Sequence, residues 1–248
     1  MEPILEFKHL SHSYHTLEDE TPALSDLCFS VPKGKFLSIV GPSGCGKSTL
    51  LSLISGLLTP EEGTIHFYGN SIGYMLQKDH LLEWRTILKN VLLGLEIQHK
   101  LTPESIEKAH IYLKQYGLED FENAKPSELS GGMRQRAALI RTLLLEPDLL
   151  LLDEPFSALD YQTRLLVSDD IGQIIRAEKR TAILVTHDLS EAISLGDMVL
   201  VLTSRPGSVK AMIPLSFDLK EDTPLHRRNS PEFKQYFNLV WKEVGAHE

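Results

Sequence analysis

The sequence predicts an α/β fold with a mainly parallel sheet at its core, an antiparallel β subdomain at the N-terminus and an inserted helical subdomain. The first forty residues carry only strand patterns. Strand and helix patterns alternate after residue 149, which is typical of a parallel sheet flanked by helices. Residues 86–146 carry helical patterns that interrupt this series. We therefore expect them to project from the core as a subdomain.

The individual elements follow from apolar periodicity and from the turn residues between the periodic segments. Pro103 suits the first turn of a helix, and the helix after the third strand should end near Gly56 and Pro60. We expect strands at 4–8, 23–31, 36–40, 64–68, 72–76, 149–152, 182–186, 198–203 and 209–215. We expect the other helices at 87–98, 103–116, 132–145 and 163–178.

The C-terminal segment predicts a separate amphipathic helix, so the chain divides into 1–230 and a tail at 231–248. Ser230 can cap this helix and Pro231 can open it. One face carries the apolar side chains, which are Phe233, Tyr236, Phe237, Val240, Trp241 and Val244. We expect this face to pack on the core; docking of a partner is the alternative.

The composition is that of an ordinary globular protein, with 248 residues, 42% of them hydrophobic and 24% charged. A net charge of −9 disfavours nucleic-acid binding. No apolar run reaches the roughly 18–20 residues of a membrane span, and no secretory signal is evident. We expect a cytoplasmic chain that reaches a membrane only through a partner. Both cysteines should be reduced, with Cys28 buried in its strand as a small hydrophobe and Cys45 covered only when nucleotide is bound.

A phosphate-binding loop lies between the strand at 36–40 and the following helix. Its pattern, G-x-x-x-x-G-K-[ST], places backbone N–H groups around phosphate oxygens at a helix N-terminus. Lys47 would add a charge near the β- and γ-phosphates, and the Ser48 hydroxyl would bind Mg²⁺. The predicted nucleotide-binding residues are Gly41, Pro42, Ser43, Gly44, Cys45, Gly46, Lys47, Ser48 and Thr49.

The apolar run at 149–152 ends in Asp153 and Glu154, which complements this loop. A buried strand of this kind would deliver both carboxylates to the edge of the sheet beside the phosphates. Asp153 would hold Mg²⁺, and Glu154 could polarise an attacking water.

The chain resembles ATP-binding-cassette ATPases over roughly residues 4–215. Leu129-Ser130-Gly131-Gly132-Met133-Arg134-Gln135 resembles their signature motif, with Met133 in place of the commoner Gln. The resemblance implies that Ser130, Gly131 and Gly132 complete the ATP site of an opposite subunit. It therefore implies a dimer with a second copy or a close paralogue, closing head to tail around two ATP molecules.

Other motif positions carry roles that the resemblance implies. Gln77 matches the glutamine that touches Mg²⁺ or the attacking water, and His187 matches the histidine that contacts the γ-phosphate. Tyr14 would stack on adenine, although an aromatic residue there could also belong to the core. Residues 157–160 resemble the loop that crosses the dimer interface.

Within the family, the chain is similar to nitrate/sulfonate/taurine-type importer ATPases, which include transporters of thiamine-pyrimidine precursors. Residues 81–84, 154–160 and 204–207 carry this similarity, but Glu83 stands where proline is usual. It implies an ATPase at the cytoplasmic face of the membrane, coupled to separate permease subunits and indirectly to a solute-binding protein. The permease groove is expected near Gln77, Leu81, Leu82 and Trp84, although Trp84 could be subdomain core. A soluble cassette ATPase, a non-catalytic nucleotide-binding module and an exporter subunit are the alternatives.

Overall fold

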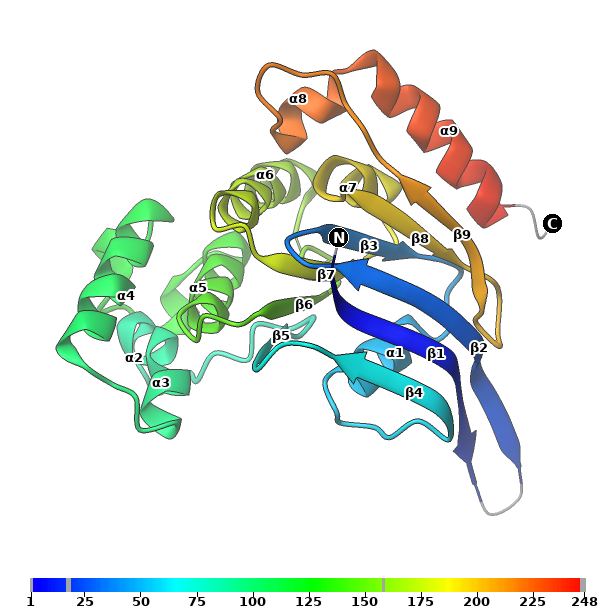
Figure 1. Ribbon diagram of the computed structural model, residues 1–248. Helices are drawn as coiled ribbons and strands as arrows, with labels where there is room; N and C mark the ends of the chain where they lie inside the picture. Colours follow the sequence, from blue (N-terminus) through cyan, green and yellow to red (C-terminus); the bar gives the residue numbers. More distant parts are fainter. Residues whose placement is uncertain (1, 17–18, 158, 246–248) are drawn as a thin grey trace.

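The computed structural model describes residues 2–16, 19–157 and 159–245, and within them a six-stranded sheet forms the centre (Figure 1). Its strand order is β5-β6-β7-β3-β8-β9. The five strands from β5 to β8 run parallel, and β9 is antiparallel to β8 at one edge. The predicted mainly parallel core is therefore confirmed. The strands are β3 (Phe36–Val40), β5 (Ile72–Met75), β6 (Leu149–Asp153), β7 (Thr181–Val185), β8 (Met198–Leu202) and β9 (Val209–Pro214).

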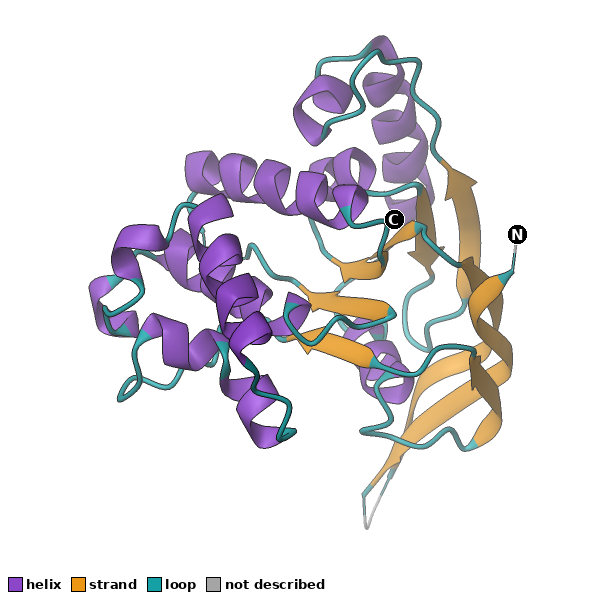
Figure 2. Ribbon diagram, turned by 60° about the vertical axis from the view of Figure 1, so that its left-hand side comes forward, coloured by secondary structure: helices purple, strands orange, loops and turns teal. Residues whose placement is uncertain are grey.

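A smaller antiparallel sheet, in the order β2-β1-β4, packs against one face of the central sheet (Figures 1 and 2). It comprises β1 (Pro3–His15), β2 (Glu20–Pro32) and β4 (Glu62–Phe67). The expected strands at 4–8 and 23–31 were too short. β1 pairs with neighbours on both sides, and this pairing continues through polar residues that carry no apolar pattern. The N-terminal antiparallel β subdomain is confirmed.

The alternation along β6 shows how the two faces of the central sheet are covered. Leu149 and Leu151 join the apolar cluster beneath the antiparallel sheet and α1 (Lys47–Ile54). Leu150 and Leu152 join the opposite cluster, beneath α5 (Gly131–Leu143) and α6 (Tyr161–Ala177). Both faces of β6 are buried, which explains the unbroken run of leucines at 149–152.

The helical segment lies to one side of both sheets (Figure 1). It contains α2 (Ile87–Val91), α3 (Leu93–Ile97) and α4 (Pro103–Gln115), and α5 connects it to the core. Two short 3₁₀ turns, η1 (Glu119–Phe121) and η2 (Pro126–Glu128), link α4 to α5. The expectation of one helix at 87–98 was wrong. The helix is interrupted at Leu92 (φ −79°, ψ −8°), which separates α2 from α3. In α3, Gly94 lies close to the Leu145 side chain.

The C-terminal helices pack around β3, β8 and β9. α7 (Leu189–Leu195) lies on β3 and β8, α9 (Pro231–Gly245) lies on β8 and β9, and α8 (Pro224–Arg228) packs against α6 and α7. Val240 of α9 is fully buried. Phe233, Tyr236, Phe237 and Val244 pack around it, so this part of the tail face covers the core as expected. Trp241 does not cover the core. It follows the buried Val240 by one position on the helix, so it is 63% exposed, and its ring stacks on Phe237.

Two further findings concern burial. Cys28 is exposed, which corrects the expectation of a buried thiol: Leu27 faces the core, so its neighbour faces solvent across the pleat. Cys45 is fully buried within the phosphate loop. None of the helices in the described part of the chain is both long and apolar enough to cross a bilayer.

Candidate functional site

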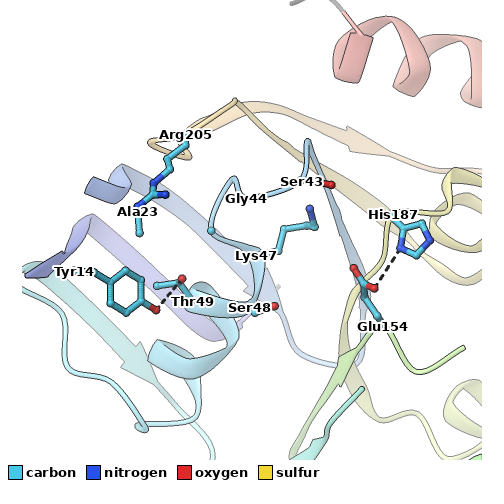
Figure 3. A pocket seen from close by; sticks show the side chains of 11 residues that line it. Tyr14, Ala23, Ser43, Gly44, Lys47, Ser48, Thr49, Glu154, His187 and Arg205 are labelled. Atoms are coloured by element: carbon cyan, nitrogen blue, oxygen red, sulfur yellow. Dashed lines mark hydrogen bonds and ion pairs between the residues drawn. The ribbon is translucent and has the colours of Figure 1, made fainter. Parts of the chain in front are cut away.

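A cavity of about 670 Å³ opens beside the start of α1, between the two sheets (Figure 3). Its volume lies within the usual range for small-molecule sites. It brings together nine of the predicted site residues, from four separate segments of the chain. The lining residues are Tyr14, Ala23, Ser43, Gly44, Gly46, Lys47, Ser48, Thr49, Glu154, His187 and Arg205.

The phosphate loop connects β3 to α1 through backbone that only glycine adopts easily. Gly44 and Gly46 have φ of +78° and +97°. A Cβ on Gly46 would meet a Leu24 methyl at 2.6 Å and the Ala23 carbonyl at 2.9 Å. A Cβ on Gly41 would likewise meet the Cys45 sulfur at 2.9 Å, so the loop can close only with glycine at these positions.

Lys47 is held by the loop that it follows. Its Nζ donates to the Gly41 carbonyl at 2.8 Å and to the Pro42 carbonyl at 3.0 Å. Burial raises the pKa of the Cys45 thiol, and the Lys47 charge opposes that rise. Gly41, Pro42 and Cys45 therefore form the back of the loop, while the residues that line the cavity form its front.

Ser48 and Asp153 bring a hydroxyl and a carboxylate together at the end of β6. The Ser48 hydroxyl lies 3.5 Å from Asp153 Oδ1, and the Tyr74 hydroxyl donates to Asp153 Oδ2 at 3.4 Å. Burial raises the pKa of Asp153, and the neighbouring Glu154 carboxylate adds to the rise. A partly desolvated carboxylate beside a hydroxyl suits a hard cation, so these residues fit Mg²⁺.

Glu154, Gln77 and His187 converge at the end of β6. Gln77 Nε2 lies 3.4 Å from Glu154 Oε2. His187 Nδ1 lies 3.3 Å from the same oxygen (Figure 3). Glu154 has φ of +44°, which is rare for a glutamate, and its N–H donates to the Val185 carbonyl at 2.9 Å. The strain aims one carboxylate at both partners. Gln77 thus contacts Glu154, with no hydrogen bond to Ser48 or Asp153 among the described contacts.

Tyr14 stands at the opposite end of the cavity. Its hydroxyl lies 3.1 Å from Thr49 Oγ1, and its residue is 44% exposed, so a ring face is accessible and the core alternative does not hold. Sequence reasoning missed Arg205, which lines the same end and donates from Nε to the Pro22 carbonyl at 3.0 Å. Arg205 belongs to the stretch 204–207, which in the sequence indicated only similarity to importer ATPases.

The signature residues are outside the cavity of this chain. Ser130 caps α5 and accepts from the Met133 N–H at 3.4 Å, and both Ser130 and Gly131 are exposed. Gly132 is buried, and a Cβ there would meet the Thr163 methyl at 2.8 Å. Ser130 and Gly131, two of the three residues expected to bind the nucleotide of an opposite subunit, therefore form a surface separate from this cavity, and Gly132 is buried next to them. Ala158, in the loop expected to cross a dimer interface, lies outside the described residues.

An ion-pair network explains Glu83, the residue that departs from the importer pattern. Arg134 donates to Asp79 through Nε at 2.9 Å and through Nη2 at 3.1 Å. The same Nη2 lies 2.9 Å from Glu83 Oε1. Hydrogen bonding from Arg134 lowers the pKa of Asp79 against the opposing effect of burial. The segment after Gln77 is thereby tied to the first turns of the signature helix.

A second network supports the loop that carries His187. The Thr186 hydroxyl donates to Glu191 Oε2 at 2.6 Å and accepts from the Asp188 N–H at 3.0 Å. Burial raises the pKa of Glu191 to about 7. Arg164 lies near both acids, 3.6 Å from Asp188 and 3.9 Å from Glu191, and donates to the Leu159 carbonyl at 3.0 Å. None of these four side chains was identified from the sequence.

Comparison with known proteins identifies the family. Residues 24–157, more than half of the chain, match the ABC transporter family. The chain is 45% identical to an uncharacterized ABC transporter ATP-binding protein of Bacillus subtilis, YtlC, over 98% of this chain and 96% of the relative. It is 39% identical to the aliphatic sulfonates import ATP-binding protein SsuB of Bacillus licheniformis, over 92% and 89%. It is 37% identical to the nitrate import ATP-binding protein NrtD of Synechocystis sp., over 98% and 96%.

A solved structure agrees with this result. The chain aligns with the dimeric post-hydrolysis state of the ATP-binding cassette MJ0796 bound to ADP and Pi, with a TM-score of 0.74 and 30% identity. The alignment covers 86% of this chain and 99% of that one. The cavity beside a glycine-rich loop is lined by Lys47 and Glu154, and Asp153 lies next to Ser48, so its groups suit a nucleotide phosphate. The chain belongs to the ABC transporter family, as an ATP-binding subunit whose ATP hydrolysis is coupled to transport.

Proposed function

We propose that this subunit drives the uptake of a small solute through a separate permease, as the ATPase of an importer. The proposed cargo class comprises sulfonates, taurine, nitrate and thiamine precursors. Sulfonate and nitrate import ATPases are among the similar proteins, at nearly equal identity, so the relatives support the class without singling out one member. Residues 1–230 would form the cassette, with the helical segment at 86–146 inserted and the tail helix packed on its edge.

The observation that carries the proposed mechanism is the separation of the two halves of the site. Lys47, Ser48, Asp153 and Glu154 gather at one cavity, whereas Ser130 is exposed on another surface. We infer that Ser130, Gly131 and Gly132 of a second copy complete the site across a head-to-tail dimer. The similar MJ0796 cassette is dimeric in its post-hydrolysis state, which supports this arrangement.

The residues at the cavity divide the chemistry between them. Lys47 and the loop N–H groups would hold the β- and γ-phosphates, while Tyr14 stacks on the base. Ser48 and Asp153 would hold Mg²⁺, and that ion would supply positive charge beside the phosphate oxygens. Glu154 would accept a proton from the attacking water, and Gln77 and His187 would orient that carboxylate and the γ-phosphate.

The permease would bind beside the Gln77 segment, which places this subunit at the cytoplasmic face of a membrane. Trp84 is 75% exposed and Leu76 is 42% exposed, so apolar side chains are available there and Trp84 is not subdomain core. Leu81 is buried, at 6% exposure, and belongs to the core rather than to the groove. The solute-binding protein would act on the permease from the other side.

The first test is Glu154→Gln, assayed together with the permease. ATP binding should persist, and turnover should fall by roughly 10²–10⁴-fold, the usual contribution of a general base. Glu107→Gln, an exposed glutamate on α4, is the matched control and should turn over normally. Near-normal turnover in Glu154→Gln would overturn the assignment. Co-purification with the permease and its solute-binding protein, followed by ligand profiling of the latter, tests the cargo class.

A further inference from the structure

Three side chains with metal-binding atoms meet on the antiparallel sheet, among residues that do not line the nucleotide cavity. His9 comes from β1, and Asp26 and Cys28 come from β2. His9 Nδ1 lies 2.7 Å from Asp26 Oδ1 and 3.6 Å from Cys28 Sγ, and Cys28 Sγ lies 3.9 Å from Asp26 Oδ1. All three residues are exposed, so the cluster is open to ions in solution.

Irregular backbone brings these side chains together. His9 and Asp26 both have φ of +50°, in the left-handed region, and the pairing of β1 with β2 shifts register between Phe7 and Leu10. In a regular strand, successive side chains would point to opposite faces. The bulge turns His9 toward its neighbours on β2, and bulges commonly re-aim side chains in this way.

The His9 backbone also contacts the Cys28 sulfur. The His9 N–H donates to Cys28 Sγ at 3.2 Å. A thiolate is the form in which cysteine binds a metal. One residue thus offers both a ring nitrogen as ligand and an N–H that hydrogen-bonds the neighbouring sulfur ligand. This contact is independent of the closeness of the three side chains.

We propose that His9, Asp26 and Cys28 form a surface zinc site, with water as the fourth ligand. One thiolate, one imidazole and one carboxylate are a ligand set that Zn²⁺ takes. Usual zinc bond lengths in a tetrahedron put N and S about 3.6 Å apart, S and O about 3.5 Å apart, and N and O about 3.3 Å apart. The observed distances of 3.6 and 3.9 Å to sulfur are close to these values. The hydrogen-bonded His9–Asp26 pair must open by about 0.6 Å, and the Cys28–Asp26 pair must close by about 0.4 Å.

Zinc here would pin β1 to β2 at their bulge. The same two strands carry Tyr14 and Ala23 to the nucleotide cavity, so the metal would stabilise that part of the chain. It would not enter the ATPase chemistry, because none of its ligands lines the cavity. The zinc proposal can therefore be tested independently of the proposed transport function.

The test uses the purified full-length chain, kept reduced, and Zn²⁺ as the calorimetric probe. We compare the wild type with Cys28→Ser, His9→Asn and Asp26→Asn; asparagine tolerates the left-handed backbone, so these variants should fold. His15→Gln is the matched control, because it removes another exposed histidine that is paired with a carboxylate, Glu61 at 2.8 Å. Circular dichroism and the unfolding midpoint without zinc verify that each variant is folded.

We expect one Zn²⁺ to bind per wild-type chain at this site and to raise the unfolding midpoint. Losing a hydrogen-bond partner of a metal ligand already weakens binding by ~10–100-fold, so losing a ligand should weaken it by at least ~100-fold. The His15→Gln variant should bind as the wild type does. Co²⁺ should show a sulfur-to-metal charge-transfer band that Cys28→Ser abolishes. Unchanged zinc affinity in Cys28→Ser, or a cobalt band that persists there and so arises from Cys45, would overturn the proposal.

Discussion

Glu191 should make the stability of this chain depend on pH, because it is a carboxyl group buried beneath the His187 loop. Its residue is 6% exposed, and burial raises its pKa from 4.5 to about 7. Asp188 adds to the rise, while the hydrogen bond from Thr186 and the charges of Arg164 and His187 oppose it. The perturbation that isolates this group is Glu191→Gln, which keeps the shape and an oxygen that can accept from Thr186.

The sign follows from the direction of the shift. The folded state holds this proton more tightly than the unfolded state, so the contribution to stability is fully present below the unfolded pKa. It is lost as the pH rises through the folded pKa near 7. Since each pKa unit corresponds to about 1.4 kcal/mol, the contribution falls by about 2.5 kcal/mol between about pH 5 and about pH 8.

Urea unfolding of nucleotide-free wild type and Glu191→Gln, at intervals across this pH range, measures the effect. The free energy of unfolding of the wild type should decline relative to the variant as the pH rises. Glu107→Gln removes one exposed glutamate and controls for net charge; its gap from the wild type should change far less with pH. A wild-type–Glu191→Gln gap that stays constant, or that changes in favour of the wild type at high pH, would refute the reasoning.

Four further experiments test other parts of the structure. Lys47→Ala should abolish ATP binding in a fluorescent-nucleotide titration, while the unfolding midpoint stays near that of the wild type. Tyr14→Ala should weaken ATP binding by about tenfold, and Tyr14→Phe should retain most of it if stacking is the contact that matters. Asn90 is fully buried with four hydrogen bonds, so Asn90→Ala should lower the free energy of unfolding by roughly 3 kcal/mol in urea. A double-mutant cycle of Arg134→Ala with Glu83→Ala should give a coupling below about 1 kcal/mol, since Glu83 is half exposed.

Much of the site could be predicted because its residues follow strands whose type the sequence reveals. Glu154 and His187 both follow buried apolar strands, and parallel strands deliver their carboxyl ends to one edge. β6 and β7 are neighbours in that sheet, so the two side chains meet. The phosphate loop could be predicted without any inference about strand order, because its pattern is contiguous in the sequence.

The residues that were missed act across long sequence separations. Arg205 reaches Pro22, and Arg164 reaches Asp188, through contacts that no periodicity encodes. Glu83 departs from the importer pattern, in which proline is usual, and the sequence does not show that Arg134 lies beside it. The prediction that Cys28 is buried was wrong for a different reason. An apolar pattern shows that a strand has a buried face, but it does not always show which residues point outward.

Backbone strain marks places that the sequence hides. Glu154, His9 and Asp26 all have φ between +44° and +50°, yet none is a glycine, the residue that most often adopts this region. At Glu154 the strained backbone accompanies contacts to Gln77 and His187; at His9 and Asp26 it brings together the ligands of the proposed zinc site. In both cases a regular strand would separate side chains that here converge. An unfavourable backbone persists only when surrounding contacts hold it, so strain that coincides with converging side chains supports a functional hypothesis at these residues.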